Sequence, residues 1–85
     1  MDHYINEENS IKGLFSKILK VPVSEISENL DPDKIGTWDS LNHLTLISSF
    51  EEEFSIDIEP EEMIAMYQNY KVFKSIILRK LLSEK

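Results

Sequence analysis

The sequence predicts an all-α fold, a small four-helix bundle with three longer helices and one short third helix. The 85-residue chain has only two glycines and three prolines, too few for a turn-rich β fold. Hydrophobic residues make up 41 % of the chain and recur at helical spacing in several segments. We therefore expect one domain, residues 1–85, and a monomer.

The first helix is expected from about residue 4 to residue 20. Its apolar residues follow the spacing of one helical face, and they are Ile11, Leu14, Phe15, Ile18 and Leu19. Pro22 ends the helix, because the residue before a proline avoids the helical region. Residues 21–39 then form a long loop between the first and second helices. A loop of this length in a small domain is more often functional than idle.

The second helix is expected to begin near Asp39-Ser40 and to end near Phe54. Helical spacing predicts a core face, with Leu41 and Leu46 to either side of it. The residues of this face are Leu44, Ile47, Phe50 and Phe54.

The remaining chain predicts a loop and two further helices. Residues 55–58 alternate like a strand but have no partner, so we expect a loop with two buried isoleucines. Pro60 suits the first position of a short third helix that ends near Met66. Asn69 is the predicted N-cap of a fourth helix. Its apolar stripe consists of Val72, Phe73, Ile76, Ile77, Leu81 and Leu82.

The negative charge of the chain is concentrated in its central part. The net charge is −7, and residues 35–70 contain acidic residues but no lysine or arginine. A basic protein surface is the natural partner for such a segment. Nucleic acid is not expected as a partner, because binding phosphates requires basic side chains.

Other absences from the composition also limit the function. Cysteine is absent, which excludes disulfides, thiolate metal sites and cysteine nucleophiles. No apolar run approaches the roughly 20 residues that span a bilayer, so membrane insertion is not expected. The N-terminus lacks the basic start and apolar stretch of a signal peptide. These features favour a cytoplasmic protein without a metal site.

Ser40 lies where the long loop is expected to enter the second helix. A helix N-terminus presents unpaired N–H groups and partial positive charge, which stabilise an anion such as a phosphodiester. An exposed serine hydroxyl can be esterified to phosphate there, and Asp39 can orient a metal ion or a basic residue of a modifying enzyme. The alternative at this position is that Asp39 or Ser40 is only an N-cap.

The sequence around Ser40 resembles that of the acyl carrier proteins. The family's modified serine lies in an Asp-Ser-Leu motif at the start of its second helix, matched here by residues 39–41. The acidic-aromatic end of that helix matches Phe-Glu-Glu-Glu-Phe at 50–54, and the start of the third helix matches residues 58–62. The resemblance covers essentially the whole chain, including the long loop.

The resemblance implies a carrier rather than a catalyst, with no catalytic residue. Ser40 would receive 4′-phosphopantetheine from coenzyme A, with Asp39 and Leu41 beside it. The thiol of that group would hold an acyl or aminoacyl group as a thioester. The implied partners are a phosphopantetheinyl transferase, an acyl- or aminoacyl-activating ligase, and acyltransferases or condensing enzymes with basic docking surfaces.

The resemblance also implies a docking surface on the second helix and its surroundings. The residues expected there are Leu41, Asn42, Thr45, Glu51, Glu52, Glu53, Glu61, Glu62 and Met63. Met63 and Met66 could contact an acyl chain or partner, or simply fill the core. His43 is expected at the surface, where it would tune partner contact.

Some positions depart from the commonest bacterial fatty-acid carriers. Those carriers have acidic residues two and five positions after the modified serine, whereas this chain has Asn42 and Thr45. A large apolar residue at the eighth position is replaced by Ser48. These differences favour a dedicated biosynthetic pathway over housekeeping fatty-acid synthesis.

Three other interpretations remain open from sequence alone. Residues 31–42 partly match an EF-hand calcium loop, but Ile35 and Asn42 occupy positions that need oxygen ligands and a bidentate glutamate. A serine esterase using Ser40 and His43 lacks the nucleophile-elbow motif. A non-catalytic helical adaptor would make the serine motif and the charge distribution coincidental.

Overall fold

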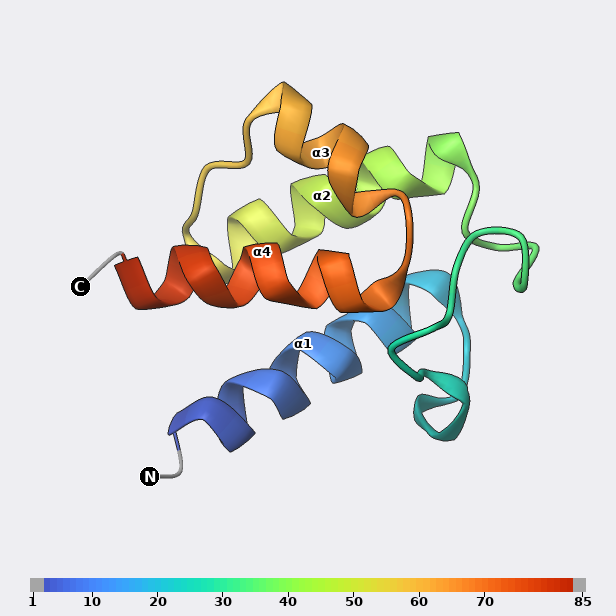
Figure 1. The fold of residues 1–85 in the computed structure, drawn as a ribbon, viewed down its shortest axis with the longest axis horizontal. Helices are drawn as coiled ribbons and strands as arrows, with labels where there is room; N and C mark the ends of the chain where they lie inside the picture. Colours follow the sequence, from blue (N-terminus) through green and yellow to red (C-terminus); the bar gives the residue numbers. More distant parts are fainter. Residues whose placement is uncertain (1–2, 84–85) are drawn as a thin grey trace.

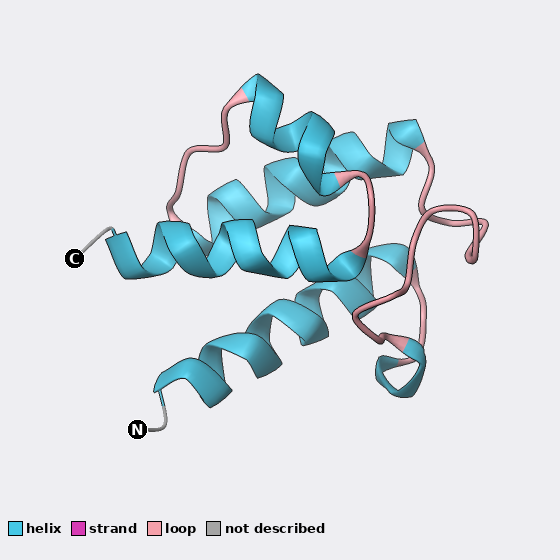
Figure 2. Ribbon diagram, in the orientation of Figure 1, coloured by secondary structure: helices cyan, strands magenta, loops and turns pink. Residues whose placement is uncertain are grey.

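The computed structural model describes residues 3–83, with side chains described from residue 7 onward. Four α-helices are present: α1 (His3–Leu19), α2 (Ser40–Phe54), α3 (Pro60–Met66) and α4 (Tyr70–Ser83). A single 3₁₀ turn, η1 (Val23–Glu25), lies in the long connection between α1 and α2. The described range contains no strand, which confirms the predicted all-α bundle (Figures 1 and 2).

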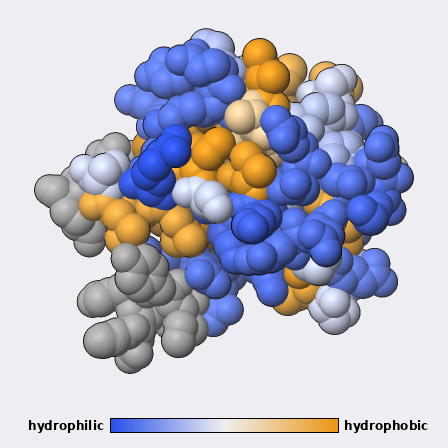
Figure 3. All heavy atoms as spheres, viewed as in Figure 1, coloured by the Kyte–Doolittle hydropathy of each residue, from blue (hydrophilic) through white to orange (hydrophobic). Residues whose placement is uncertain are grey.

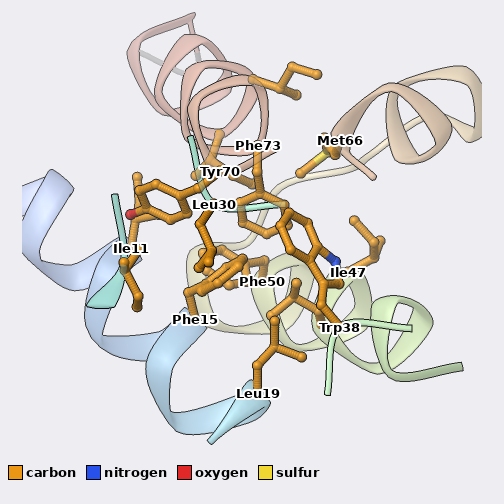
Figure 4. Packing of buried hydrophobic residues seen from close by; sticks show 14 of the residues in the cluster. Ile11, Phe15, Leu19, Leu30, Trp38, Ile47, Phe50, Met66, Tyr70 and Phe73 are labelled. Carbon is orange, nitrogen blue, oxygen red and sulfur yellow. The ribbon is translucent and has the colours of Figure 1, made fainter. Parts of the chain in front are cut away.

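The core is built around aromatic rings from three segments of the chain. Phe15 of α1 packs edge-to-face on Tyr70 and Phe73 of α4, with ring centroids 4.9 and 5.3 Å apart. Trp38, from the end of the long loop, meets Phe15 in the same geometry at 5.1 Å. Edge-to-face contacts of this kind favour a fixed arrangement of the rings (Figure 4).

The long loop is held against the core by four of its apolar residues. Its buried residues are Val21, Ile26, Leu30 and Trp38. The loop also bonds to the start of α4, because the amides of Tyr70 and Lys71 donate to the carbonyls of Leu30 and Glu28. The loop therefore brings Ser40 to a fixed position at the edge of the bundle.

Local signals set most helix ends. Asn69 Oδ1 accepts from the Val72 amide at 2.9 Å, which confirms the predicted cap of α4. Pro60 is the first residue of α3, as expected, and Glu62 Oε1 accepts from the Glu59 amide at 2.9 Å. The helix α2 ends at Phe54, and its C-cap Ser55 has a left-handed φ of 56°.

The predicted core face of α2 is wrong in part. Leu44 is 51 % exposed, whereas Leu46 is fully buried. His43, expected at the surface, is only 4 % exposed and occupies the core position one turn before Ile47. The buried face of α2 is therefore His43, Leu46, Ile47 and Phe50. Between α2 and α3, Ile56 is buried and Ile58 is half-buried, close to the prediction.

No helix within residues 3–83 is long and apolar enough to cross a membrane. Figure 3 shows a mostly hydrophilic surface on one face of the molecule, interrupted by hydrophobic patches.

Candidate functional site

Ser40 is the first residue of α2, and its side chain is exposed. Asp39 is the N-cap, and its Oδ1 accepts from the Asn42 amide at 2.8 Å. The Asp39 carbonyl also accepts from the His43 amide at 2.8 Å. Asp39 therefore supplies the capping interaction, and Ser40 is not needed for it.

The Ser40 hydroxyl has no hydrogen-bond partner within the described part of the chain. The amides of Ser40 and Leu41 occupy the first two helical positions, where α-helical geometry offers no carbonyl partner. Free N–H groups at a helix N-terminus are favourable neighbours for a phosphate. The exposed hydroxyl and these two donors thus belong to the same first turn of α2.

The first turn of α2 is also fixed to the preceding loop. Asn42 Nδ2 donates to the Thr37 carbonyl at 2.9 Å. Asn42, expected to face partners, is exposed, but this bond also gives it a structural role. Thr45, one turn further along, is exposed as well.

An open apolar groove of about 320 Å³ begins beside Ser40 and runs between α2 and α3. Its lining residues are Ser40, Leu41, His43, Leu44, Met63, Ile64 and Tyr67. Leu41 is 73 % exposed and Ile64 is 72 % exposed, so both are large apolar residues at the surface. The groove gives an apolar group attached near Ser40 a surface to lie against.

The sequence predicted only part of this groove. Leu41 and Met63 were expected near the site, and both line it. Met66 is fully buried, so of the two methionines it fills the core. Leu44 and Ile64 were not expected there. The spacing held a signal for Leu44, because it follows Ser40 by four residues and therefore shares its helical face.

His43 lies in the floor of the groove and bonds on both ring nitrogens. Its Nδ1 accepts from Trp38 Nε1–H at 3.0 Å, and its Nε2 lies 2.9 Å from the Met63 carbonyl. Burial lowers the pKa of His43 from its ordinary value. Because both nitrogens are engaged, the ring is not available to activate the Ser40 hydroxyl, contrary to the esterase interpretation.

The acidic residues expected on the docking surface differ in their surroundings. Glu52, Glu53 and Glu61 are exposed. Glu51 is half-buried and accepts from the Ile58 amide at 2.8 Å. Glu62 is half-buried and pairs with Lys80 at 2.8 Å and with Arg79 at 3.3 Å. The Lys80 ammonium lowers the pKa of the Glu62 carboxyl.

Glu51–Glu53 also lie far from Ser40. They follow it by 11–13 residues on one helix, which is about 17–20 Å at a rise of about 1.5 Å per residue. The charged end of α2 and its serine end are therefore separate parts of one surface.

In residues 31–42, which partly match an EF-hand loop, the first acidic residue bonds to a lysine of the same loop. Asp31 Oδ1 accepts from the Lys34 amide, and its Oδ2 pairs with Lys34 Nζ at 3.1 Å. Within residues 3–83, no group of three histidine, cysteine or acidic residues is arranged to hold a metal ion.

The chain matches a known protein family over most of its length. A family model described as "Phosphopantetheine attachment site" matches residues 9–73 of the chain. The chain is also similar to the acyl carrier protein of Buchnera aphidicola subsp. Schizaphis graminum (strain Sg). The two are 40 % identical over 57 residues, which are 67 % of this chain and 72 % of that protein.

Proposed function

The chain belongs to the acyl carrier protein family, and we propose that Ser40 is the residue that bears its 4′-phosphopantetheine. The protein is a phosphopantetheine-carrying acyl carrier, and acyl carrier proteins are carriers rather than catalysts.

One observation carries that assignment: the N-cap role is taken by Asp39, which leaves the Ser40 hydroxyl exposed and without a partner. A serine that only capped the helix would accept from an amide of the first turn. Ser40 instead presents its Oγ outward at the positive end of α2. The residues present therefore fit a phosphodiester on Ser40.

Each neighbour of Ser40 has a distinct role in this proposal. When bound, 4′-phosphopantetheine supplies a terminal thiol that holds an acyl group as a thioester. The amides of Ser40 and Leu41 stabilise the negative charge on the Ser40 ester. Asp39 keeps the helix start in place with Oδ1 and offers Oδ2 to a metal ion or basic residue of the modifying enzyme.

The groove between α2 and α3 is the proposed binding surface for an apolar acyl group carried by the protein. It starts at Ser40 and is walled by Leu41, Leu44, Met63 and Ile64. Covering the apolar surface that these side chains expose is favourable by about 25 cal/mol for each Å² removed from water. The groove is open, so cargo remains accessible to partner enzymes.

Glu52, Glu53 and Glu61 are the proposed contacts for basic surfaces of partner enzymes. They are exposed, whereas Glu51 and Glu62 are engaged within the protein. Exposed ion pairs contribute about 0–1 kcal/mol each and mainly speed encounter, which suits brief visits to several enzymes. The proposed partners are the transferase, the activating ligase, and acyltransferases or condensing enzymes.

Intact mass after incubation with coenzyme A, Mg²⁺ and a broad-specificity phosphopantetheinyl transferase tests the serine. We expect one phosphopantetheine on the wild type and none on Ser40→Ala. Ser48→Ala is the matched control, because Ser48 is an exposed serine on the same helix. Modification that persists in Ser40→Ala, or that is lost in Ser48→Ala, would overturn the assignment.

Charge reversal tests the docking residues. We expect the double variant Glu52→Lys/Glu53→Lys to slow a partner enzyme about 3–10-fold at low salt, with a smaller effect at high salt. The control is Glu25→Lys/Asp33→Lys, which makes the same charge change at exposed residues of the long loop. Equal slowing by both variants would show that only net charge matters.

We place the carrier in a dedicated biosynthetic pathway. Asn42 and Thr45, near Ser40, are exposed and neutral, so this end of α2 lacks charge that fatty-acid carriers present. Introducing it with Thr45→Glu, which leaves the Asn42–Thr37 hydrogen bond intact, should raise the rate with a condensing enzyme of fatty-acid synthesis. An unchanged or lower rate would contradict this placement.

A further inference from the structure

Two hydrogen bonds on the ring of His43 link three segments of the chain near the groove that begins at Ser40. Trp38 Nε1 lies 3.0 Å from His43 Nδ1, and His43 Nε2 lies 2.9 Å from the Met63 carbonyl. An indole N–H only donates and a carbonyl only accepts. The partners therefore assign the imidazole as neutral, with its proton on Nε2.

This Trp38–His43–Met63 relay joins the parts of the chain that surround the site. Trp38 precedes Ser40 by two residues, His43 lies in the first turn of α2, and Met63 belongs to α3. Within the described residues, the bond to Met63 is the one hydrogen bond that connects α2 to α3. By contrast, α3 packs extensively on α4 and is tied to it by the Glu62–Lys80 pair.

The surroundings of His43 make the charged form unfavourable. The ring is 4 % exposed and lies against Tyr67 at 4.8 Å and Phe73 of α4 at 6.4 Å between centroids. Tyr67 is the titratable group that faces it, and its hydroxyl bonds to the Trp38 carbonyl at 3.4 Å. Burial lowers the pKa of His43, opposed by the Met63 carbonyl, with no charged side chain of the described range involved.

We propose that His43 is a positioning residue for the Ser40 site: its neutral ring holds α3 and the Trp38 segment in place, and its protonation releases α3 and opens the groove. The proposal rests on Ser40 being the attachment site. A proton on Nδ1 would face the Trp38 N–H, donor against donor, so that bond must break. A charge would also be left in an apolar pocket.

The direction of the pH effect follows from the lowered pKa of His43. In the closed state the ring resists protonation, whereas in an open or unfolded state it titrates near its ordinary value of 6.5. The stabilisation from neutral His43 is therefore complete above pH 6.5. It is lost as the pH falls below 6.5 toward the closed-state pKa of His43.

Amide hydrogen exchange on the apo protein tests the release of α3. Between pH 7.5 and 5.5, we expect the protection factors of amides 63–67 to fall by up to about tenfold. This factor is the ratio of protonated to neutral imidazole in the open state at one pH unit below 6.5. Because α3 opens without the rest of the bundle, amides 63–67 should exchange faster than amides in the middle of α1 and α4 at both pH values. The fluorescence of Trp38, the one tryptophan of the chain, should change over the same pH range.

Two variants separate positioning from simple stability. His43→Gln keeps an amide that can accept from Trp38 and donate to Met63, but it does not titrate. It should therefore retain protection at pH 7.5 and lose the pH dependence. His3→Gln removes the other histidine and should behave as the wild type. A pH dependence unchanged in His43→Gln would overturn the proposal.

Imidazole nitrogen shifts keep the test decisive if His43→Gln does not fold. At pH 7.5, wild-type His43 should show a protonated Nε2 and an unprotonated Nδ1, and the opposite tautomer would refute the relay. The transferase assay is then run at both pH values. Wild-type protein that accepts no phosphopantetheine contradicts the Ser40 assignment, whereas normal uptake with uniform exchange contradicts only the role of His43.

Discussion

Two apolar regions of this small protein serve opposite purposes. Between α1 and α4, the rings of Phe15, Tyr70 and Phe73 are buried and meet edge-to-face within 5.3 Å. Between α2 and α3, Leu41 and Ile64 are left more than 70 % exposed around an open groove. The closed region provides stability, and the open region is the surface that we propose for cargo and partners.

Trp38 connects the two regions. One side of its ring system meets Phe15 of the closed core at 5.1 Å, and its Nε1–H donates to His43 in the floor of the groove. The position of the site is therefore set by the core, although the groove itself contributes little burial. In the proposed opening of the groove, the core between α1 and α4 therefore stays in place.

Truncating the closed core should produce the largest effect. Phe73 of α4 is fully buried and contacts rings from α1, α2 and the long loop. We expect Phe73→Ala to lower the free energy of unfolding by about 3–5 kcal/mol, measured by urea denaturation. The control Leu82→Ala, at a 42 % exposed residue of the same helix, should change it by less than about 1 kcal/mol. Similar losses from both variants would argue against a core centred on these rings.

The elements that the sequence predicted best are those set by local signals. Pro60 fixes the start of α3, and Asn69 caps α4 through an amide three residues away, so neither depends on distant packing. The groove, by contrast, required knowledge of how α2 is rotated against its neighbours.

That rotation was mispredicted because α2 carries two overlapping apolar faces. Leu44, Ile47 and Phe50 fit helical spacing, but so do His43, Leu46, Ile47 and Phe50. Counting His43 as polar favoured the first set. The structure buries the second because Trp38 and the Met63 carbonyl satisfy both nitrogens of His43. Such partners come from distant parts of the chain and leave no periodic signal.

Removing the cap beside Ser40 should have an intermediate effect. Asp39→Ala leaves the Asn42 amide without its partner, and we expect a loss of about 1 kcal/mol in the free energy of unfolding. The rate of phosphopantetheine uptake should fall by more than the small loss of folded protein would cause, because the first turn that presents Ser40 is no longer fixed. Asp57→Ala, at an exposed loop acid, is the control for charge. Normal uptake by Asp39→Ala would show that the transfer needs neither the cap nor the Asp39 carboxylate.

The smallest effect on stability is expected for a residue of the groove. Helix α2 allows a direct comparison of the open groove with the closed core. Leu44 and Leu46 are two residues apart on α2, yet one is 51 % exposed and the other fully buried. Urea denaturation should show a loss of about 2–5 kcal/mol for Leu46→Ala and of less than about 1 kcal/mol for Leu44→Ala. If the groove shelters cargo, Leu44→Ala should nevertheless shorten the lifetime of an attached long-chain acyl thioester in water. An unchanged lifetime would restrict the exposed leucine to partner contact, because the groove would then serve docking alone.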